Sequence, residues 1–194
     1  MGRREEKKAE TRERLRAAAF ARFERRGYDA TKIEDIARDA GVSPRTVYRY
    51  FPTKSELVFA ATPTTLKQLT DLIAARPRSE RPYTAVWNAL LEFVPNLDSS
   101  VGIAQGRIIA ANPTLYRSSL EVRDQIADAV GEALIERGGP GGTDADRRLL
   151  GHLAMAAMLV AAREWRNAGP RRKLLRHYLD GTLAAIPRLA RMPR

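Results

Sequence analysis

The chain of 194 residues is long enough for one large or two small domains with a substantial core. Its 34 Lys and Arg residues against 23 Asp and Glu give a formal charge of +11, which favours a polyanionic partner, although the excess is spread along the whole chain. The absence of cysteine excludes disulfides and thiol chemistry, and the lack of any long apolar run or signal-peptide core predicts a cytoplasmic protein with no membrane partner.

Three helices are predicted before residue 60. The first carries an apolar stripe at helical spacing and ends before Gly27, the stripe being Leu15, Ala18, Ala19 and Phe23. Thr31 and Glu34 have the spacing of a capping box, so a second helix is expected to begin near Lys32. Gly41 is expected to end that helix, because glycine adopts the positive φ that a tight turn requires.

The third helix follows directly. Ser43 is a predicted N-cap and Pro44 suits the first helical position, where its missing N–H is not needed. The side chains on its outer face can bond phosphates or base edges, and they are Arg45, Thr46, Tyr48 and Arg49. Two short helices joined by a tight turn indicate a helix-turn-helix for DNA binding, although such pairs also occur in helical proteins that never meet DNA.

Three motifs sharpen this interpretation: A-A-x-x-x-F-x-x-x-G-Y, then I-A-x-x-A-G-V-S, then T-V-Y-x-Y-F-P-x-K-x-x-L. The stretch from Arg12 to Phe59 that carries them closely resembles the N-terminal domain of the TetR family of transcriptional regulators. The family often has His or Asn near Arg49 and Tyr50, so this pair is expected to alter which bases are read.

The resemblance implies a set of DNA-binding residues: Thr31, Lys32, Ser43, Arg45, Thr46, Tyr48, Arg49, Tyr50 and Lys54. The positions that it assigns to phosphates are Thr31, Lys32, Tyr48 and Lys54. Those that it assigns to bases or the adjoining backbone are Arg45, Thr46 and Arg49, while Tyr50 suits either role.

Beyond Leu57 the pattern predicts further helices and no strand, so the fold class is all-α. Pro63 interrupts the helix that begins at Thr53, and further helices are expected at 83–94, 103–111, 114–137, 143–168 and 170–189. Residues 138–142 are a glycine-rich loop with no Gly-Lys-Ser/Thr after it, which argues against phosphate binding. We expect a helix-turn-helix domain at 1–60 and a ligand-binding and dimerisation domain at 61–194.

The last two helices are expected to form a homodimer. Small and apolar side chains at helical spacing indicate close helix packing, and the residues assigned to the interface are Gly151, Ala154, Ala161, Leu175, Tyr178, Leu179, Leu183 and Ile186. The alternative is that they pack inside one chain. A two-fold dimer would read a palindromic operator in double-stranded DNA, because one short helix reads too few bases.

The middle helices carry more apolar surface than one small helical layer requires, which suggests a small-molecule pocket. Its candidate lining is Trp87, Leu91, Gln105, Ile108, Ile109, Tyr116, Leu120, Arg123, Met155, Met158 and Leu159, although most of these residues are expected to be plain core. The segment from Ile108 to Trp165 resembles, more loosely, regulators of the mycofactocin system within the TetR family. That resemblance implies an apolar inducer, long-chain acyl-CoA being the first candidate.

An enzyme is not expected. The two histidines, His152 and His177, lie in the predicted dimerisation helices, and the sequence has no nucleophile elbow, zinc-protease motif or dinucleotide fingerprint. No cofactor or metal is expected either. A sequence-indifferent architectural DNA binder is the other alternative, and a ligand-responsive repressor is the function that the sequence favours.

Overall fold

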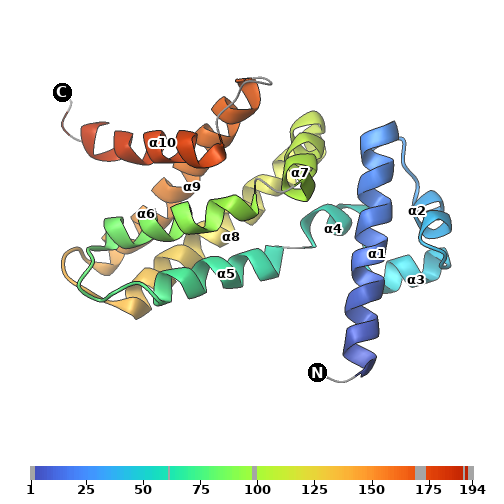
Figure 1. Cartoon of the computed structure of the whole chain (residues 1–194), viewed down its shortest axis with the longest axis horizontal. Helices are drawn as coiled ribbons and strands as arrows, with labels where there is room; N and C mark the ends of the chain where they lie inside the picture. The colour runs from blue at the N-terminus through green and yellow to red at the C-terminus, as the bar shows by residue number, and fades with distance from the viewer. Residues whose placement is uncertain (1–2, 61, 98–99, 169–173, 190, 192–194) are drawn as a thin grey trace. The chain divides into compact units, whose positions relative to one another are not determined.

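The computed structural model describes residues 3–60, 62–97, 100–168, 174–189 and 191 (Figure 1). In these ranges the fold is all-α, as predicted, and no strand is present. The helices are α1 Arg3–Arg26, α2 Ile33–Asp39, α3 Pro44–Tyr50, α4 Lys54–Phe59, α5 Thr62–Ala74, α6 Pro82–Phe93, α7 Ser100–Ala111, α8 Pro113–Arg137, α9 Asp144–Asn167 and α10 Leu175–Leu189, with a 3₁₀ turn at Val94–Asn96. No helix among the described residues combines the length and apolar character that a membrane crossing needs.

The chain divides into two compact units. The first contains Met1–Thr62 together with Ile103–Ser118, and the second contains Pro63–Gly102 and Ser119–Arg194. Most of α7 and the first turns of α8 therefore pack with the N-terminal helices. The functional division at residue 60 stays a prediction.

Side-chain caps explain the starts of α3 and α4 in the first unit. The Ser43 hydroxyl accepts the Thr46 N–H at 3.2 Å at the start of α3, and the Thr53 hydroxyl accepts the Glu56 N–H at 3.3 Å at the start of α4. Gly41 has a φ of 65°, as a tight turn between α2 and α3 requires. The three predictions at these positions are confirmed.

The predicted capping box at Thr31 is wrong. Lys32 is the N-cap of α2 and makes no side-chain cap hydrogen bond, while the Thr31 hydroxyl donates to the Gly27 carbonyl at 2.8 Å. Thr31 is only 2% exposed, so its hydroxyl needs a partner within the protein, and the Gly27 carbonyl provides it. The Thr31 side chain therefore stabilises the α1–α2 loop and does not cap α2.

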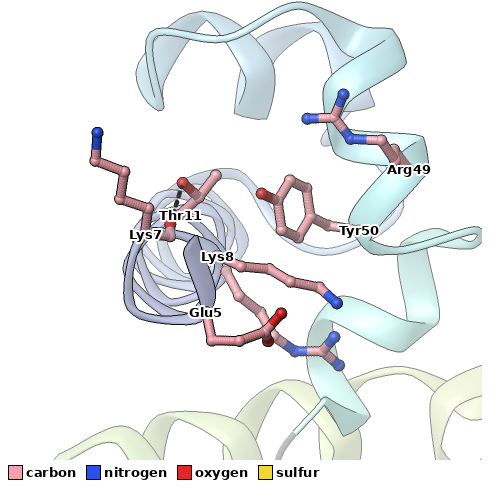
Figure 2. Close-up of a pocket in the computed structure, with 7 residues that line it drawn as sticks. Glu5, Lys7, Lys8, Thr11, Arg49 and Tyr50 are labelled. Carbon is pink, nitrogen blue, oxygen red and sulfur yellow. Dashed lines mark hydrogen bonds between the residues drawn. The ribbon is translucent and has the colours of Figure 1, made fainter. Parts of the chain in front are cut away.

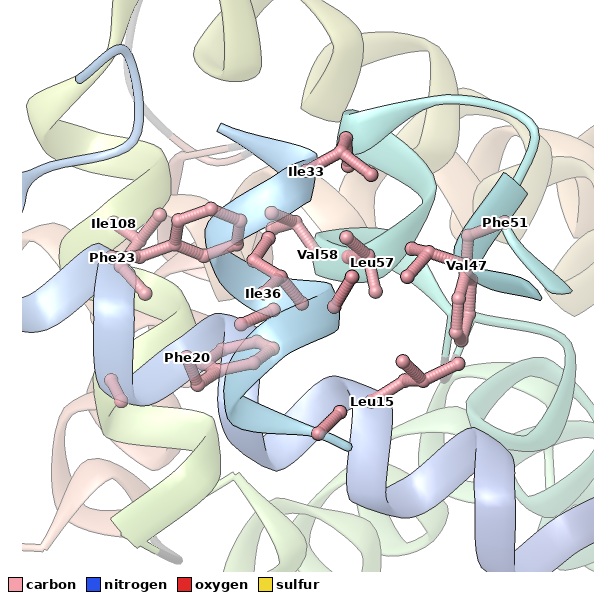
Figure 3. Close-up of a cluster of buried hydrophobic side chains, with 14 of the residues drawn as sticks. Leu15, Phe20, Phe23, Ile33, Ile36, Val47, Phe51, Leu57, Val58 and Ile108 are labelled. Carbon is pink, nitrogen blue, oxygen red and sulfur yellow. The ribbon is translucent and has the colours of Figure 1, made fainter. Parts of the chain in front are cut away.

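One apolar core holds the first unit together (Figure 3). Its members include Leu15, Phe20, Phe23, Ile33, Ile36, Val47, Phe51, Leu57, Val58, Ile108 and Leu115. Ile108 and Leu115 come from α7 and α8, which explains why residues 103–118 belong to this unit. The Gln105 amide adds a polar tie, because its Nε2 donates to the Val58 carbonyl at 2.7 Å.

In the second unit, α9 packs along α10 and also against α6. Tyr83 of α6 donates its hydroxyl to the Leu183 carbonyl at 2.6 Å, and Trp87 Nε1 donates to Asp180 Oδ1 at 3.0 Å. The helix predicted from Pro170 begins at Leu175 in the described chain, and Pro170 itself lies outside the described residues.

The glycine-rich segment between α8 and α9 is a loop, as predicted, and it surrounds a buried arginine. The Arg147 guanidinium donates to the carbonyls of Gly139 and Gly142 at 3.1 and 3.0 Å. Thr143 and Asp146 form a capping box at the start of α9. The loop carbonyls are therefore satisfied by a protein cation, which is a structural role for this segment.

Candidate DNA interface

The exposed face of α3 carries the side chains expected to read DNA. Val47 and Phe51 are completely buried, which fixes the rotation of this seven-residue helix. Arg45, Tyr48 and Arg49 are exposed on the other side, with Tyr48 48% exposed. Long cationic and phenolic side chains on one short exposed helix suit both base edges and phosphates.

The start of α3 uses two of the predicted residues in its own cap. The hydroxyl oxygens of Ser43 and Thr46 lie 3.0 Å apart, in addition to the Ser43 bond to the Thr46 N–H. Whichever of the two hydroxyls donates in this contact, the accepting one keeps its own O–H for a further bond. Both residues therefore sit at the exposed end of α3, and their DNA contacts stay predictions.

A salt bridge fixes α2 against α1. Arg22 Nε and Nη2 donate to the two Asp39 carboxylate oxygens at 2.5 and 2.8 Å, which is a bidentate pair. The Arg22 hydrogen bond lowers the pKa of the Asp39 carboxyl below its usual value, and burial partly opposes this. The pair joins the last residue of α2 to the helix that supports the whole domain.

Lys54 has a role that the sequence did not indicate. Its ammonium lies 2.8 Å from the Tyr28 carbonyl, 3.1 Å from the Thr31 carbonyl and 3.5 Å from the Asp29 carbonyl. It also lies 4.2 Å from the centre of the Tyr28 ring, and burial lowers its pKa. Three carbonyls occupy its three N–H donors, so Lys54 clamps the α1–α2 loop to the start of α4.

This clamp changes the expectation for two predicted phosphate ligands. The side chains of Thr31 and Lys54 are both engaged by the α1–α2 loop, whereas Lys32 is exposed at the start of α2. Tyr50 is half-buried at the end of α3. Phosphate contacts by these four residues stay predictions, and Lys32 and Tyr50 are better placed to make them.

The residues predicted to line a ligand pocket fall into both compact units. Those in the first unit are Gln105, Ile108, Ile109 and Tyr116, and those in the second are Trp87, Leu91, Leu120, Arg123, Met155, Met158 and Leu159. Ile108 is buried in the helix-turn-helix core, and Leu120 is 46% exposed. A pocket formed by these residues stays a prediction.

Six of the eight residues predicted for the dimer interface lie in the core of their own chain. They are Gly151, Ala154, Ala161, Leu175, Leu179 and Leu183, all buried, while Tyr178 and Ile186 are half-buried. A Cβ on Gly151 would lie 2.1 Å from the Ala127 carbonyl oxygen, so this glycine allows α9 to approach α8. The alternative of packing inside one chain accounts for these six residues.

Sequence reasoning missed the apolar side chains that α9 and the segment containing α10 do expose. They are Leu149, Val160, Leu174 and Leu189, each at least half exposed. Leu149 and Val160 lie eleven positions apart, three helical turns, so they share one face of α9. Their spacing was readable, but the larger buried stripe on the same helix masked it.

Comparisons with known proteins match both parts of the chain. Residues 15–61 match the model described as bacterial regulatory proteins, tetR family, and residues 80–189 match the model described as the MftR C-terminal domain. The transcriptional regulator TcmR of Streptomyces glaucescens is 27% identical over 173 residues, covering 84% of this chain and 76% of TcmR. MftR of Mycobacterium tuberculosis, a mycofactocin biosynthesis regulator, is 26% identical over 150 residues, covering 76% of this chain and 75% of MftR.

Solved structures show the same fold. SmeT of Stenotrophomonas maltophilia in complex with triclosan has a TM-score of 0.67 at 21% identity, covering 90% of each chain. FadR of Thermus thermophilus in complex with lauroyl-CoA has a TM-score of 0.58 at 18% identity, covering 94% of this chain and 96% of that one.

The Asp39 pair gives the first unit a pH dependence. Because the folded pKa of Asp39 is below its unfolded value, the pair stabilises the fold above the unfolded pKa, about 3.9, and the contribution is lost as pH falls through the folded pKa. Asp39→Asn should therefore unfold more easily than wild type near neutral pH, with the difference shrinking in acid. Urea unfolding from pH 7 to pH 2 measures this, with Glu24→Gln, at an exposed position on α1, as control. A difference that stayed constant over this range would contradict the assignment.

The Lys54 clamp can be separated from a phosphate contact. Lys54→Met keeps the apolar stem but leaves loop carbonyls without a donor, so the free energy of unfolding should fall by about 1–3 kcal/mol. Lys54→Met should leave the salt dependence of DNA binding unchanged. Lys32→Met should instead leave the free energy of unfolding unchanged and lower the slope of log K against log salt by about 1 per lost phosphate. Urea unfolding and DNA titrations at several salt concentrations measure both. A lowered slope for Lys54→Met would show that this lysine binds DNA.

Proposed function

Because the chain belongs to the TetR family of bacterial regulatory proteins, we propose that it is a repressor that a small molecule releases from its operator. The family consists of DNA-binding transcriptional regulators, which are not enzymes. The observation that carries the proposal is the exposed face of α3, with Arg45, Tyr48 and Arg49 on a helix whose rotation is fixed by Val47 and Phe51. A regulator of this kind acts on the bacterial chromosome, and so in the cytoplasm.

We propose a homodimer on a palindromic operator. A seven-residue helix contacts only a few base pairs, so useful specificity needs two copies on half-sites about 34–36 Å apart. The exposed apolar side chains Leu149 and Val160 on α9, and Leu174 and Leu189 at the two ends of α10, supply surface that a second copy would cover. This assignment replaces the buried residues of the same helices as the candidate interface.

The inducer is proposed to be an apolar compound carried in the C-terminal part of the chain. Residues 80–189 match the MftR C-terminal domain, which supports an effector of the same chemical class for this chain and for MftR. The structure of FadR, which has the same fold, contains lauroyl-CoA. SmeT, bound to triclosan, is a repressor of a multidrug efflux pump. Long-chain acyl-CoA is therefore the first compound to test, and an aromatic biocide is the second.

Base reading by Arg45 is tested by binding-site selection from random DNA. Wild type should recover a palindrome, and Arg45→Ala should lose preference at one position in each half-site, at a cost of about 1–3 kcal/mol in binding. Tyr48→Phe is the control for a residue assigned to phosphate, and it should weaken binding to all sequences alike. Recovery of no motif by wild type would favour the architectural DNA binder, and an unchanged motif with Arg45→Ala would remove that residue from base reading.

The effector is tested by calorimetry with free protein and with protein saturated by the selected duplex. Since coupling is reciprocal, a true inducer binds more weakly to the DNA complex, by a factor of roughly 5 to 150 for usual coupling energies. Lauroyl-CoA, free laurate and triclosan are the three probes. A compound with equal affinity in both titrations is not the inducer, however tightly it binds.

A further inference from the structure

A basic cleft lies beside the reading helix. It measures about 840 Å³ and lies between the first turns of α1 and the end of α3. Its lining is Glu5, Lys7, Lys8, Thr11, Arg12, Arg49 and Tyr50. In Figure 2, Tyr50 points from the end of α3 toward α1, and Lys8 extends from α1 across the cleft. Four cations thus surround a space that holds a single carboxylate.

The charge in this cleft is not neutralised by the protein. Among the described residues, Lys7, Lys8, Arg12 and Arg49 form no ion pair with a carboxylate. Later on α1, Arg22 is paired with Asp39, and Arg16 with Glu13. The N-terminal half of α1 therefore keeps cations free for an external anion, while Arg16, Arg22 and Arg25 later on the helix are held in ion pairs.

Aromatic rings hold the two guanidinium groups in place. The Arg12 guanidinium carbon lies 4.7 Å from the centre of the Phe51 ring, and that of Arg49 lies 5.3 Å from the centre of the Tyr50 ring. A guanidinium stacked on a ring keeps its N–H edge available for hydrogen bonds. Because Phe51 is completely buried, Arg12 is anchored to the core of the domain rather than to a mobile side chain.

The cleft also continues the reading face. Arg49 belongs to both, since it lines the cleft and follows Arg45 by one helical turn on the exposed side of α3. The match to the TetR family begins at residue 15, so Lys8 and Arg12 precede the matched region. The α1 side of the cleft thus lies ahead of the residues that this family model matches.

We propose that this cleft binds the sugar–phosphate backbone of DNA next to the bases that α3 reads. This inference rests on the proposed function. Lysine is a compact point charge that suits phosphate, and contacts to phosphate fix the position of a protein on DNA without reading sequence. The cleft extends the footprint of each half-site outward and holds the end of α3 against the duplex.

The test uses the full chain and the palindromic duplex that wild type selects, in a short form and in a form extended by about six base pairs on each side. Lys8→Gln/Arg12→Gln should bind the extended duplex about tenfold more weakly than wild type and gain nothing from the extension. The slope of log K against log salt should fall by about 1 per lost phosphate, which is about 2–4 for a dimer. The recovered motif should stay the same.

Three matched variants sharpen the result. Lys8→Arg/Arg12→Lys keeps both charges and should restore binding. Glu5→Gln removes the opposing carboxylate and should strengthen binding, whereas Arg14→Gln removes a cation from the same helix outside the cleft and should have little effect. Circular dichroism should match wild type for all of them, because these side chains are exposed, and thermal unfolding should match wild type for Glu5→Gln and Arg14→Gln, which leave the stacking of Arg12 on Phe51 intact.

Several outcomes would overturn the proposal. An unchanged salt slope in the double glutamine variant would show that the cleft does not contact DNA. An equal loss of affinity with Arg14→Gln would show that the effect depends only on the net charge of α1. A changed motif would assign the cleft to bases rather than to phosphates. Tight binding of inorganic pyrophosphate by wild type, lost in the double variant without any change in DNA binding, would assign it to a free anion. Failure of wild type to select any motif contradicts the proposed function instead.

Discussion

The reading face depends on the burial of two side chains. A helix of seven residues is too short to be stable alone in water, because nucleation is costly and few hydrogen bonds repay it. Val47 and Phe51 are completely buried against α1 and α4, and this burial stabilises α3 in one orientation. The exposed position of Arg45, Tyr48 and Arg49 follows directly, since residues on the opposite side of so short a helix have no freedom to turn inward.

The cations of the first unit are of two kinds, those already bound by groups of the protein and those left unpaired. Arg22, which joins α1 to α2, is paired with the Asp39 carboxylate, and Lys54 is held by loop carbonyls. Such groups fix structure but offer little to DNA, because their charge is already balanced or their donors are occupied. The high net charge of the chain is therefore a poor guide to the interface, and the unpaired cations are the better one.

The sequence predicted what depends on neighbouring residues and missed what depends on distant ones. The caps at Ser43, Thr53 and Thr143 were readable because each is satisfied within three residues. Thr31 looked identical by spacing, but its hydroxyl is taken by a loop whose conformation is set elsewhere. The Lys54 clamp joins residues 26 positions apart, which no local pattern reports.

The small residues of α9 show the same limit of spacing. Gly151 does mark a close helix approach, as its spacing predicted, since a Cβ there would collide with the Ala127 carbonyl. The spacing cannot tell whether the approaching helix belongs to the same chain or to a second copy. Within the single chain Ala154 and Ala161 are almost completely enclosed, which supports packing inside one chain.

Asn112 links helix formation to the loop that supports α2. Its Oδ1 accepts the Leu115 N–H at 2.9 Å and so caps α8, while its Nδ2 donates to Asp29 Oδ2 at 2.8 Å. Asp29 lies in the loop whose carbonyls bind Lys54. One buried amide thus ties the start of α8 to the α1–α2 loop, and α8 itself continues from the first compact unit into the second.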